Sequence, residues 1–187
     1  VRALVRSKLP LSHNKLRAVV VDFNDQAAFQ NAIGQGDCVL CCIGTTMKKV
    51  KGDKEAYRKV DYDIAVNAGQ YAILQGFSQY ALVSAIGANV ASSNFYLQLK
   101  GEVETAITAM PFRSTHIFRP SVLFGERNEQ RTGESIAQSV MSALSFILIG
   151  GAEKYKPIQG KEVAAAMVAA IKSENPGKHI YHYEEMR

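Results

Sequence analysis

Short apolar segments alternate with helical patterns along nearly the whole chain, and this alternation limits the possible folds more than any other feature. Strands are expected over residues 1–5, 16–21, 38–43, 80–84, 114–118 and 178–183, and helices over residues 25–33, 54–75, 96–110, 132–148 and 160–172. Strands that alternate with helices are typical of a parallel sheet that helices cover. The segment at residues 38–43 is apolar throughout, as expected for a strand buried on both faces. The sequence therefore predicts an α/β fold with a doubly wound parallel sheet.

The composition fits one globular domain. The 187 residues are 47% hydrophobic and 21% charged, and neither a repeat nor a linker divides them. We therefore expect a single domain over residues 1–187, with a small substrate-side region around residues 124–160. The most apolar segment, residues 143–151, is much shorter than the roughly 20 residues that cross a bilayer, so we expect no membrane segment.

The formal net charge is +5, and part of it gathers in a loop-like cluster of Lys48, Lys49, Lys51 and Lys54. Such a cluster either contacts phosphates or is a solvated loop. No aromatic residues interleave it and no nucleic-acid motif follows it. The solvated loop is therefore favoured, and we do not expect nucleic acid as a partner.

The three cysteines, Cys38, Cys41 and Cys42, all lie in one apolar segment. Residues three apart in a strand point to opposite faces, so Cys38 and Cys41 are poorly placed to share a metal ion or a disulfide. Their odd number and apolar surroundings indicate reduced thiols and a cytoplasmic protein. The four histidines are scattered without the spacing of metal ligands, so we expect no metal site.

Polar or conformationally special residues follow every strand of the expected sheet. In open parallel sheets, ligands bind beyond the carboxyl ends of the strands. The candidates for cofactor binding that occupy these positions are Arg6, Ser7, Asp22, Phe23, Cys42, Ile43, Gly44, Thr45, Pro120, Ser121 and Val122. Ser84 ends the strand between them and is a candidate for catalysis.

Tyr96 and Lys100 stand four residues apart at the start of an expected helix, so their side chains can meet on one helix face. An ammonium near a phenol lowers its pKa from the usual value of about 10, which prepares the tyrosine for proton transfer. Ser84 is suited to donate a hydrogen bond to a substrate oxygen as negative charge develops there. We therefore predict a catalytic group of Ser84, Tyr96 and Lys100; a Tyr–x–x–x–Lys spacing alone also arises by chance.

The remaining candidates each have two interpretations. Arg6 either pairs with a ribose 2′-phosphate, which favours NADP over NAD, or is a solvated residue at a strand end. Asp22 either binds an adenine amino group or caps the following helix. Gly44 either lets the backbone approach a cofactor or only forms a turn, and Pro120 either supports a nicotinamide or only ends a strand.

Six segments, VRALVRS, VVVDFND, CCIGTT, VSAIGA, YLQLKGEVE and FRPSVLFGE, follow one another in an order and spacing that resemble the atypical short-chain dehydrogenase/reductases. Within that family, the chain is most similar to the TIP30-like group and its bacterial relatives. The resemblance implies a Rossmann-type domain with catalytic Ser84, Tyr96 and Lys100, of which Lys100 also holds the nicotinamide ribose. It further implies cofactor contacts, with Arg6 at the 2′-phosphate, Asp22 near adenine, Gly44 beside the cofactor, and residues 120–122 near the nicotinamide.

The chain departs from this family at its beginning, where the family has a strand, a glycine-rich turn and a helix that holds the pyrophosphate. That strand lies in the middle of the sheet, between the segments at residues 1–5 and 38–43. Without it the sheet would be split and two rows of backbone groups would lack partners. We therefore expect that a unit of roughly 25 residues is absent from the sequence.

Two functions remain open on these grounds. The first is an NADP-dependent oxidoreductase that transfers hydride to or from a carbonyl or alcohol substrate. The second is a non-catalytic NADP(H)-binding sensor or scaffold that regulates protein partners. A protein partner or a homodimer is compatible with either function, and the residues do not identify the substrate.

Overall fold

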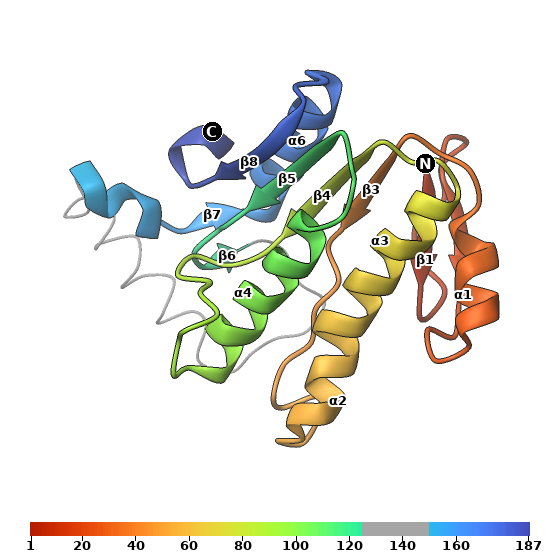
Figure 1. The fold of residues 1–187 in the computed structure, drawn as a ribbon, viewed down its shortest axis with the longest axis horizontal. Coiled ribbons are helices and arrows are strands. Elements are labelled where there is room, and N and C mark those ends of the chain that lie inside the picture. Colours follow the sequence, from red (N-terminus) through yellow and green to blue (C-terminus); the bar gives the residue numbers. More distant parts are fainter. Residues whose placement is uncertain (125–149) are drawn as a thin grey trace.

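The computed structural model describes residues 1–124 and 150–187 (Figure 1). Its strands form two larger parallel sheets and one small one. β1 (Arg2–Val5) pairs with β2 (Arg17–Val20), and a separate sheet has the order β3 (Cys38–Cys41), β4 (Gln79–Val83), β5 (Ser114–Phe118) and β8 (Gly177–Tyr181). The two-residue strands β6 (Leu123–Phe124) and β7 (Ile158–Gln159) form the third. Every pairing among them is parallel, as predicted.

The helices alternate with these strands along the chain. They are α1 (Gln26–Ile33), α2 (Lys54–Arg58), the π-helical turn η1 (Lys59–Asp63), α3 (Ile64–Leu74), α4 (Phe95–Thr108) and α6 (Gly160–Lys172), with short 3-10 turns at Gly150–Tyr155 and Glu184–Met186. None of the described helices combines the length and apolar character that a membrane crossing needs. The expected helix over residues 132–148 lies outside the described residues.

Helices cover both faces of the four-stranded sheet, because the side chains of its strands alternate between the faces. Tyr80 and Leu82 of β4 point into a core with Val103 and Ile107 of α4, which α3 completes. Ala81, between them, points to the other face and packs with Phe118, Val163 and Met167, so that α6 covers that side. The doubly wound α/β architecture is therefore confirmed (Figure 1).

The expected helix over residues 54–75 is interrupted. Its first five residues are α-helical, the next five form the wider π-helical turn η1, and α3 then continues to Leu74. A π-helical turn changes which residues face the core, and such turns are frequent at functional sites. Asp61, in the middle of η1, is turned inward and is almost fully buried.

A groove of about 1100 Å³ separates the two larger sheets. It is lined by Arg2, Ala3 and Leu4 of β1 on one side and by the residues of β3 on the other. Within the described residues, no strand pairs with the groove-side edge of either β1 or β3. The sheet is thus split at the place where the sequence predicted it, and packing of α1 on α3 connects the two parts through Phe29, Ile33, Ala68 and Ala72.

Candidate functional site

The site is built on the first turns of α4, which begin beside the carboxyl ends of the strands. Asn94 caps this helix: its side-chain oxygen accepts hydrogen bonds from the backbone N–H groups of Tyr96 at 3.0 Å and Leu97 at 3.2 Å. An N-cap of this kind satisfies backbone donors that have no partner inside the helix. The helix therefore starts at a fixed residue, and this fixes the positions of Tyr96 and Lys100 on its first turns.

The loop that follows β4 lies directly against α4 at Gly101. A Cβ atom on Gly101 would stand 2.5 Å from the backbone carbon of Asn89 and 2.5 Å from the backbone nitrogen of Val90. The Asn89 N–H also donates to the Leu97 carbonyl at 3.1 Å. Only a residue without a side chain allows this approach, so Gly101 holds the loop that starts at Ser84 against the helix that carries Tyr96.

Lys100 is buried and forms an ion pair with Asp61 of η1. The Nζ–Oδ1 distance is 2.8 Å, and the side chains are only 7% and 1% exposed. The other carboxylate oxygen of Asp61 accepts a hydrogen bond from the Thr45 N–H at 2.8 Å, and Tyr57 donates its hydroxyl to the Thr45 carbonyl at 3.2 Å. Asp61 therefore connects the predicted catalytic lysine to the loop after β3, in which Gly44 and Thr45 were predicted to contact the cofactor.

Tyr96 remains 40% exposed, and Lys100 Nζ lies 5.9 Å from the centroid of its ring. The pKa of Tyr96 is raised above its ordinary value, mainly because burial disfavours the phenolate. Lys100 acts in the predicted direction and lowers this pKa, whereas the Asp61 carboxylate raises it. The expected net lowering was therefore wrong, because burial of the phenol outweighs the lysine, and the Asp61 carboxylate adds to the effect of burial.

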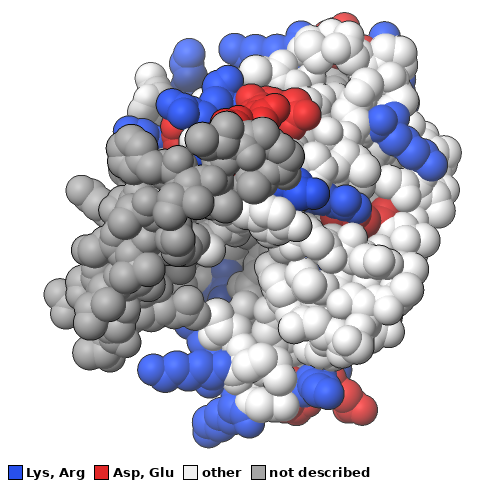
Figure 2. Space-filling view, turned by 90° about the vertical axis from the view of Figure 1, so that its left-hand side faces the viewer, with Lys and Arg blue, Asp and Glu red and all other residues white. Residues whose placement is uncertain are grey.

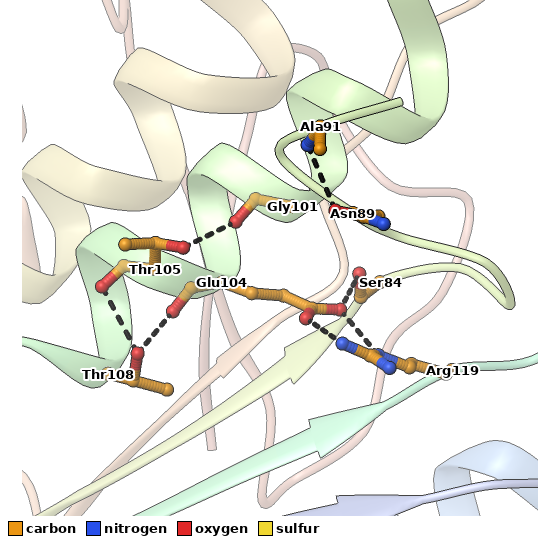
Figure 3. A network of polar contacts seen from close by, with 8 residues as sticks. All are labelled: Ser84, Asn89, Ala91, Gly101, Glu104, Thr105, Thr108 and Arg119. Carbon is orange, nitrogen blue, oxygen red and sulfur yellow. Dashed lines mark hydrogen bonds and ion pairs between the residues drawn. The ribbon is translucent and has the colours of Figure 1, made fainter. Parts of the chain in front are cut away.

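Ser84 lies at the end of β4 and is buried, and its hydroxyl donates to Glu104 Oε1 at 2.5 Å (Figure 3). Glu104 extends from α4 and also accepts two hydrogen bonds from Arg119, which follows β5: from Nε at 2.9 Å and from a terminal nitrogen at 2.5 Å. The hydrogen bond to Glu104 raises the pKa of the Arg119 guanidinium. The sequence predicted Ser84 at this edge, but neither its partner Glu104 nor the pairing of Glu104 with Arg119.

A cavity of about 570 Å³ brings together three of the predicted cofactor residues, Arg6, Asp22 and Phe23. They come from the ends of β1 and β2, as predicted for parallel strands. The opposite wall comes from η1 and α3 and includes Lys59 and Asn67, which the sequence did not indicate. Ser7 is exposed and is not among the residues that line this cavity.

Asp22 also has a local role. Its side chain accepts hydrogen bonds from the backbone and side-chain nitrogens of Asn24, both at 2.9 Å. Asp25, rather than Asp22, caps α1, because its side chain accepts from the Ala28 N–H. The interpretation of Asp22 as the helix cap was therefore wrong.

The predicted residues after β3 and β5 have different surroundings. Cys42 Sγ lies 3.9 Å from the sulfur of Met167 in α6, and Ile43 packs against the core beneath α3 and α4. Pro120 is buried, and its carbonyl accepts from the Ile86 N–H at 2.9 Å, which connects the loops after β4 and β5. Ser121 donates its hydroxyl to the Lys156 carbonyl at 2.5 Å, while Val122 is 52% exposed.

All three cysteines are free thiols. Burial raises the pKa of Cys38 to about 12 and that of Cys42 to about 11, and it also raises the pKa of Cys41. Thiols with a raised pKa hold little of the reactive thiolate at neutral pH. In the part of the chain that the structure describes, no group of three histidine, cysteine or acidic side chains is arranged to hold a metal ion.

Comparison with known proteins identifies the family. The profile of the family described as NAD(P)H-binding matches residues 1–174. The rat protein HTATIP2, also known as TIP30, is 35% identical over 133 residues, which are 71% of this chain and 54% of that protein. The protein FMP52, mitochondrial, of Eremothecium gossypii is 32% identical over 182 residues, 95% of this chain and 79% of its own length. The chain thus spans little more than half of the rat protein, and the resemblance to the TIP30-like group is confirmed.

Solved structures agree with the fold. The Bordetella bronchiseptica enzyme WbmH, in complex with NAD+, matches with a TM-score of 0.69 and 17% identity over 92% of this chain and 61% of its own. The dTDP-4-dehydrorhamnose reductase of Bacillus anthracis, in complex with NADP, matches with a TM-score of 0.65 and 13% identity over 90% of this chain and 65% of its own. Both likenesses support a Rossmann-like fold.

Replacement of Gly101 by alanine is expected to push the loop after β4 away from α4. Overpacking against backbone atoms costs about 1–3 kcal/mol, so the Gly101→Ala protein should unfold at lower denaturant concentration. Gly160→Ala is the matched control, because its added Cβ at the start of α6 meets no described atom within 4 Å apart from its chain neighbours and the backbone of its own helix. That variant should be as stable as the parent or slightly more so, and equal losses in the two proteins would contradict the close approach at Gly101.

Removal of the Asp61 carboxylate is expected to leave a buried ammonium without its partner. Breaking a buried ion pair on one side typically costs about 3–5 kcal/mol, so Asp61→Ala should lower the free energy of unfolding by about that amount. The partly exposed pair of Arg58 and Glu102 provides the control, since Glu102→Ala should cost at most about 1 kcal/mol. Denaturant titration of both variants measures the difference, and similar losses would show that the Lys100–Asp61 pair is not a buried constraint.

Proposed function

The chain belongs to the NAD(P)H-binding family, and from that premise we propose that it is an oxidoreductase that uses NADP(H) to transfer hydride to or from a carbonyl or alcohol substrate. One observation carries the proposal: Tyr96 is 40% exposed and its ring centroid lies 5.9 Å from the buried ammonium of Lys100, at the edge of a parallel sheet where such folds bind ligands. A phenol that reaches solvent with a fixed cation next to it is suited to proton exchange with a substrate oxygen.

In this proposal, the cofactor and the three catalytic residues have different roles. Bound NADP(H) would supply or accept the hydride. During reduction, Tyr96 would give its phenolic proton to the substrate oxygen, and the tyrosinate would then recover a proton from solvent. During oxidation, Tyr96 would take the proton of the alcohol. Lys100 would stabilise the phenolate through its charge and also hold the nicotinamide ribose, and Ser84 would contact the substrate oxygen.

The residues around the smaller cavity fit the adenosine end of such a cofactor. Its volume of about 570 Å³ is within the range of small-molecule sites, and it combines an aromatic ring, a guanidinium and a carboxylate in Phe23, Arg6 and Asp22. The sequence does not provide the usual glycine-rich turn for the pyrophosphate, because no G-x-G-x-x-G pattern occurs among the 187 residues. The proposal therefore assigns the adenosine contacts to this cavity and assigns no residue of this chain to the pyrophosphate.

NADP is proposed in preference to NAD because of Arg6. A guanidinium can pair with both oxygens of a 2′-phosphate, and an acidic residue would be expected at this strand end for the 2′-hydroxyl of NAD. Gly44, Thr45, Pro120, Ser121 and Val122 are proposed to lie along the nicotinamide side, with Cys42 and Ile43 before them.

A non-catalytic NADP(H)-binding sensor or scaffold is the second candidate. It is favoured by the internal partners of the proposed catalytic groups: Lys100 is paired with Asp61, and the Ser84 hydroxyl is bonded to Glu104. Both groups then hold the fold together whether or not a substrate is converted. In that case, NADP(H) binding would alter contacts with a protein partner instead of supporting turnover.

The compartment and the partners remain proposals. Free thiols suggest the cytoplasm, whereas the FMP52 relatives are named mitochondrial, so either compartment fits an oxidoreductase of this family. On the face drawn in Figure 2, basic side chains stand in separate groups among acidic and uncharged ones, which does not favour nucleic acid as a partner. A homodimer or a protein partner is compatible with both candidate functions.

Oxidation of NADPH with a panel of aldehydes and ketones tests the enzyme. We expect the intact protein to reduce at least one of them and the Tyr96→Phe variant to lose about 100-fold or more of the rate, as loss of a general acid would predict. The Tyr71→Phe variant removes the hydroxyl of another tyrosine, which packs against Phe29 on α3 outside the proposed substrate-side region, and should keep the parental rate. Tight NADPH binding without any turnover would support the sensor, and binding of neither NADPH nor NADH would contradict both candidates.

Arg6→Ala tests the cofactor preference. Loss of a charge-assisted contact with the 2′-phosphate should weaken NADPH binding roughly tenfold or more while NADH binding stays the same. Arg17→Ala removes an equivalent charge from the opposite end of the neighbouring strand β2 and should change neither affinity. Titration of cofactor fluorescence measures both constants, and an equal loss for NADPH and NADH would rule out the 2′-phosphate contact.

A further inference from the structure

The hydroxyl of Ser84 is already committed to a partner inside the protein. A serine hydroxyl has a single proton, and in Ser84 that proton points to Glu104 Oε1 across 2.5 Å. Ser84 and Glu104 are only 5% and 6% exposed, so water competes little for this hydrogen bond. A hydroxyl that donates to a carboxylate forms one of the stronger hydrogen bonds in proteins.

Glu104 in turn is held by Arg119. The two side chains form a bidentate pair, in which Nε donates to Oε1 and a terminal nitrogen donates to Oε2. Arg119 is 22% exposed at its side chain and follows β5, while Ser84 follows the neighbouring strand β4. Figure 3 shows the carboxylate of Glu104 between these two residues, so its position is fixed from both strands.

We propose that Glu104, held by Arg119, is a positioning residue that accepts the single hydrogen bond that the Ser84 hydroxyl can donate, so that Ser84 accepts a hydrogen bond from an alcohol substrate instead of donating one to a carbonyl. The proposal rests on the oxidoreductase function and specifies how that site distinguishes its two substrate classes. With its proton directed to Glu104, the Ser84 oxygen offers only lone pairs to any other group.

This arrangement has a chemical consequence for the two directions of the reaction. An alcohol brings its own O–H, which the Ser84 oxygen can accept in the bound state before the proton leaves. A ketone has only its carbonyl oxygen, which accepts hydrogen bonds and donates none. The hydrogen bond to that oxygen therefore has to come from the Tyr96 phenol. Ser84 should therefore matter for the binding of alcohols and much less for the binding of ketones.

A double-mutant cycle on the intact protein tests the positioning step without any need for turnover. The midpoint of denaturant unfolding is measured for the parent, Ser84→Ala, Glu104→Ala and the double variant, with Glu104→Gln as a milder replacement in case Glu104→Ala does not fold. We expect the loss caused by Ser84→Ala to shrink markedly when Glu104 is already replaced, because the lost bond is then counted only once. Additive losses would overturn the proposal.

Thr105→Ala provides the matched control on the same helix. Its hydroxyl bonds to the Gly101 carbonyl at 2.9 Å and does not touch the Glu104 carboxylate. The losses from Thr105→Ala and Ser84→Ala should therefore add. Coupling as strong as that between Ser84 and Glu104 would indicate a general loosening of α4 and would count against a specific contact.

Kinetics with small secondary alcohols and their matching ketones test the substrate step. We expect Ser84→Ala to raise KM for the alcohols roughly tenfold, the effect of one lost hydrogen bond, and to change KM for the ketones less than about twofold. Ser84→Thr, which keeps a hydroxyl, should restore the alcohol KM. Equal losses for both classes would overturn the acceptor role. If the parent converts neither class, the proposed function fails and the acceptor role fails with it, while the unfolding cycle still decides whether Glu104 positions Ser84.

Discussion

The buried pair of Lys100 and Asp61 is the interaction on which the candidate site depends. It joins the first turns of α4 to η1, and through Asp61 it also fixes the backbone of Thr45 after β3. Two charges this deeply buried are stable only when each has a partner of good geometry. The pair therefore restricts where α4, η1 and the loop after β3 can lie relative to one another, and the neighbouring exposed ring of Tyr96 takes its position from the same helix.

A second buried pair lies one helical turn further along α4. Lys100 and Glu104 are four residues apart and therefore lie on the same side of the helix. Lys100 binds a carboxylate from η1, whereas Glu104 binds the guanidinium of Arg119 and the hydroxyl of Ser84. One helix face thus anchors the ends of three neighbouring strands, and Gly101 between the two charged residues gives the loop after β4 room to lie against that face. The polar residues of this edge act as one connected structure.

The sequence predicted the elements of the fold well, because the alternation of strands and helices is a periodic signal. The strand Ser114–Phe118 and the helix Gly160–Lys172 have the predicted bounds, and the ends of the other predicted elements that the structure describes agree to within two residues. The two-residue strands β6 and β7 were not predicted. The parallel orientation of the strands could be predicted, because short strands that alternate with helices have few possible sheet topologies. The π-helical turn η1 could not be predicted. Residues 54–75 carry apolar residues at helical spacing, and a single wider turn leaves most of that spacing unchanged.

The candidate site was predictable only in part, for a related reason. Tyr96 and Lys100 are four residues apart, and this spacing is visible in the sequence. Asp61 becomes their neighbour only through the turn of η1. In the sequence, nothing distinguishes Glu104 from any other charged residue of an amphipathic helix. The predicted lowering of the Tyr96 pKa failed because it counted the cation four residues away but not the burial of the phenol, which dominates, nor the Asp61 carboxylate that the fold brings to it.

The internal partners of Lys100 and Ser84 bear on the choice between an enzyme and a sensor. Had both groups been without partners, a substrate would have met a free ammonium and a free hydroxyl, and either would have been costly to keep buried. In this protein the costs are offset before any ligand arrives, since each group is already bonded to a carboxylate. In the proposed reaction, catalysis would depend on what the bonded groups still offer: the charge of Lys100 would act through space on Tyr96, and the Ser84 oxygen would keep its lone pairs. A site that works in this way does not need to break its own structure to bind a substrate, and so the same contacts that stabilise the fold are compatible with turnover.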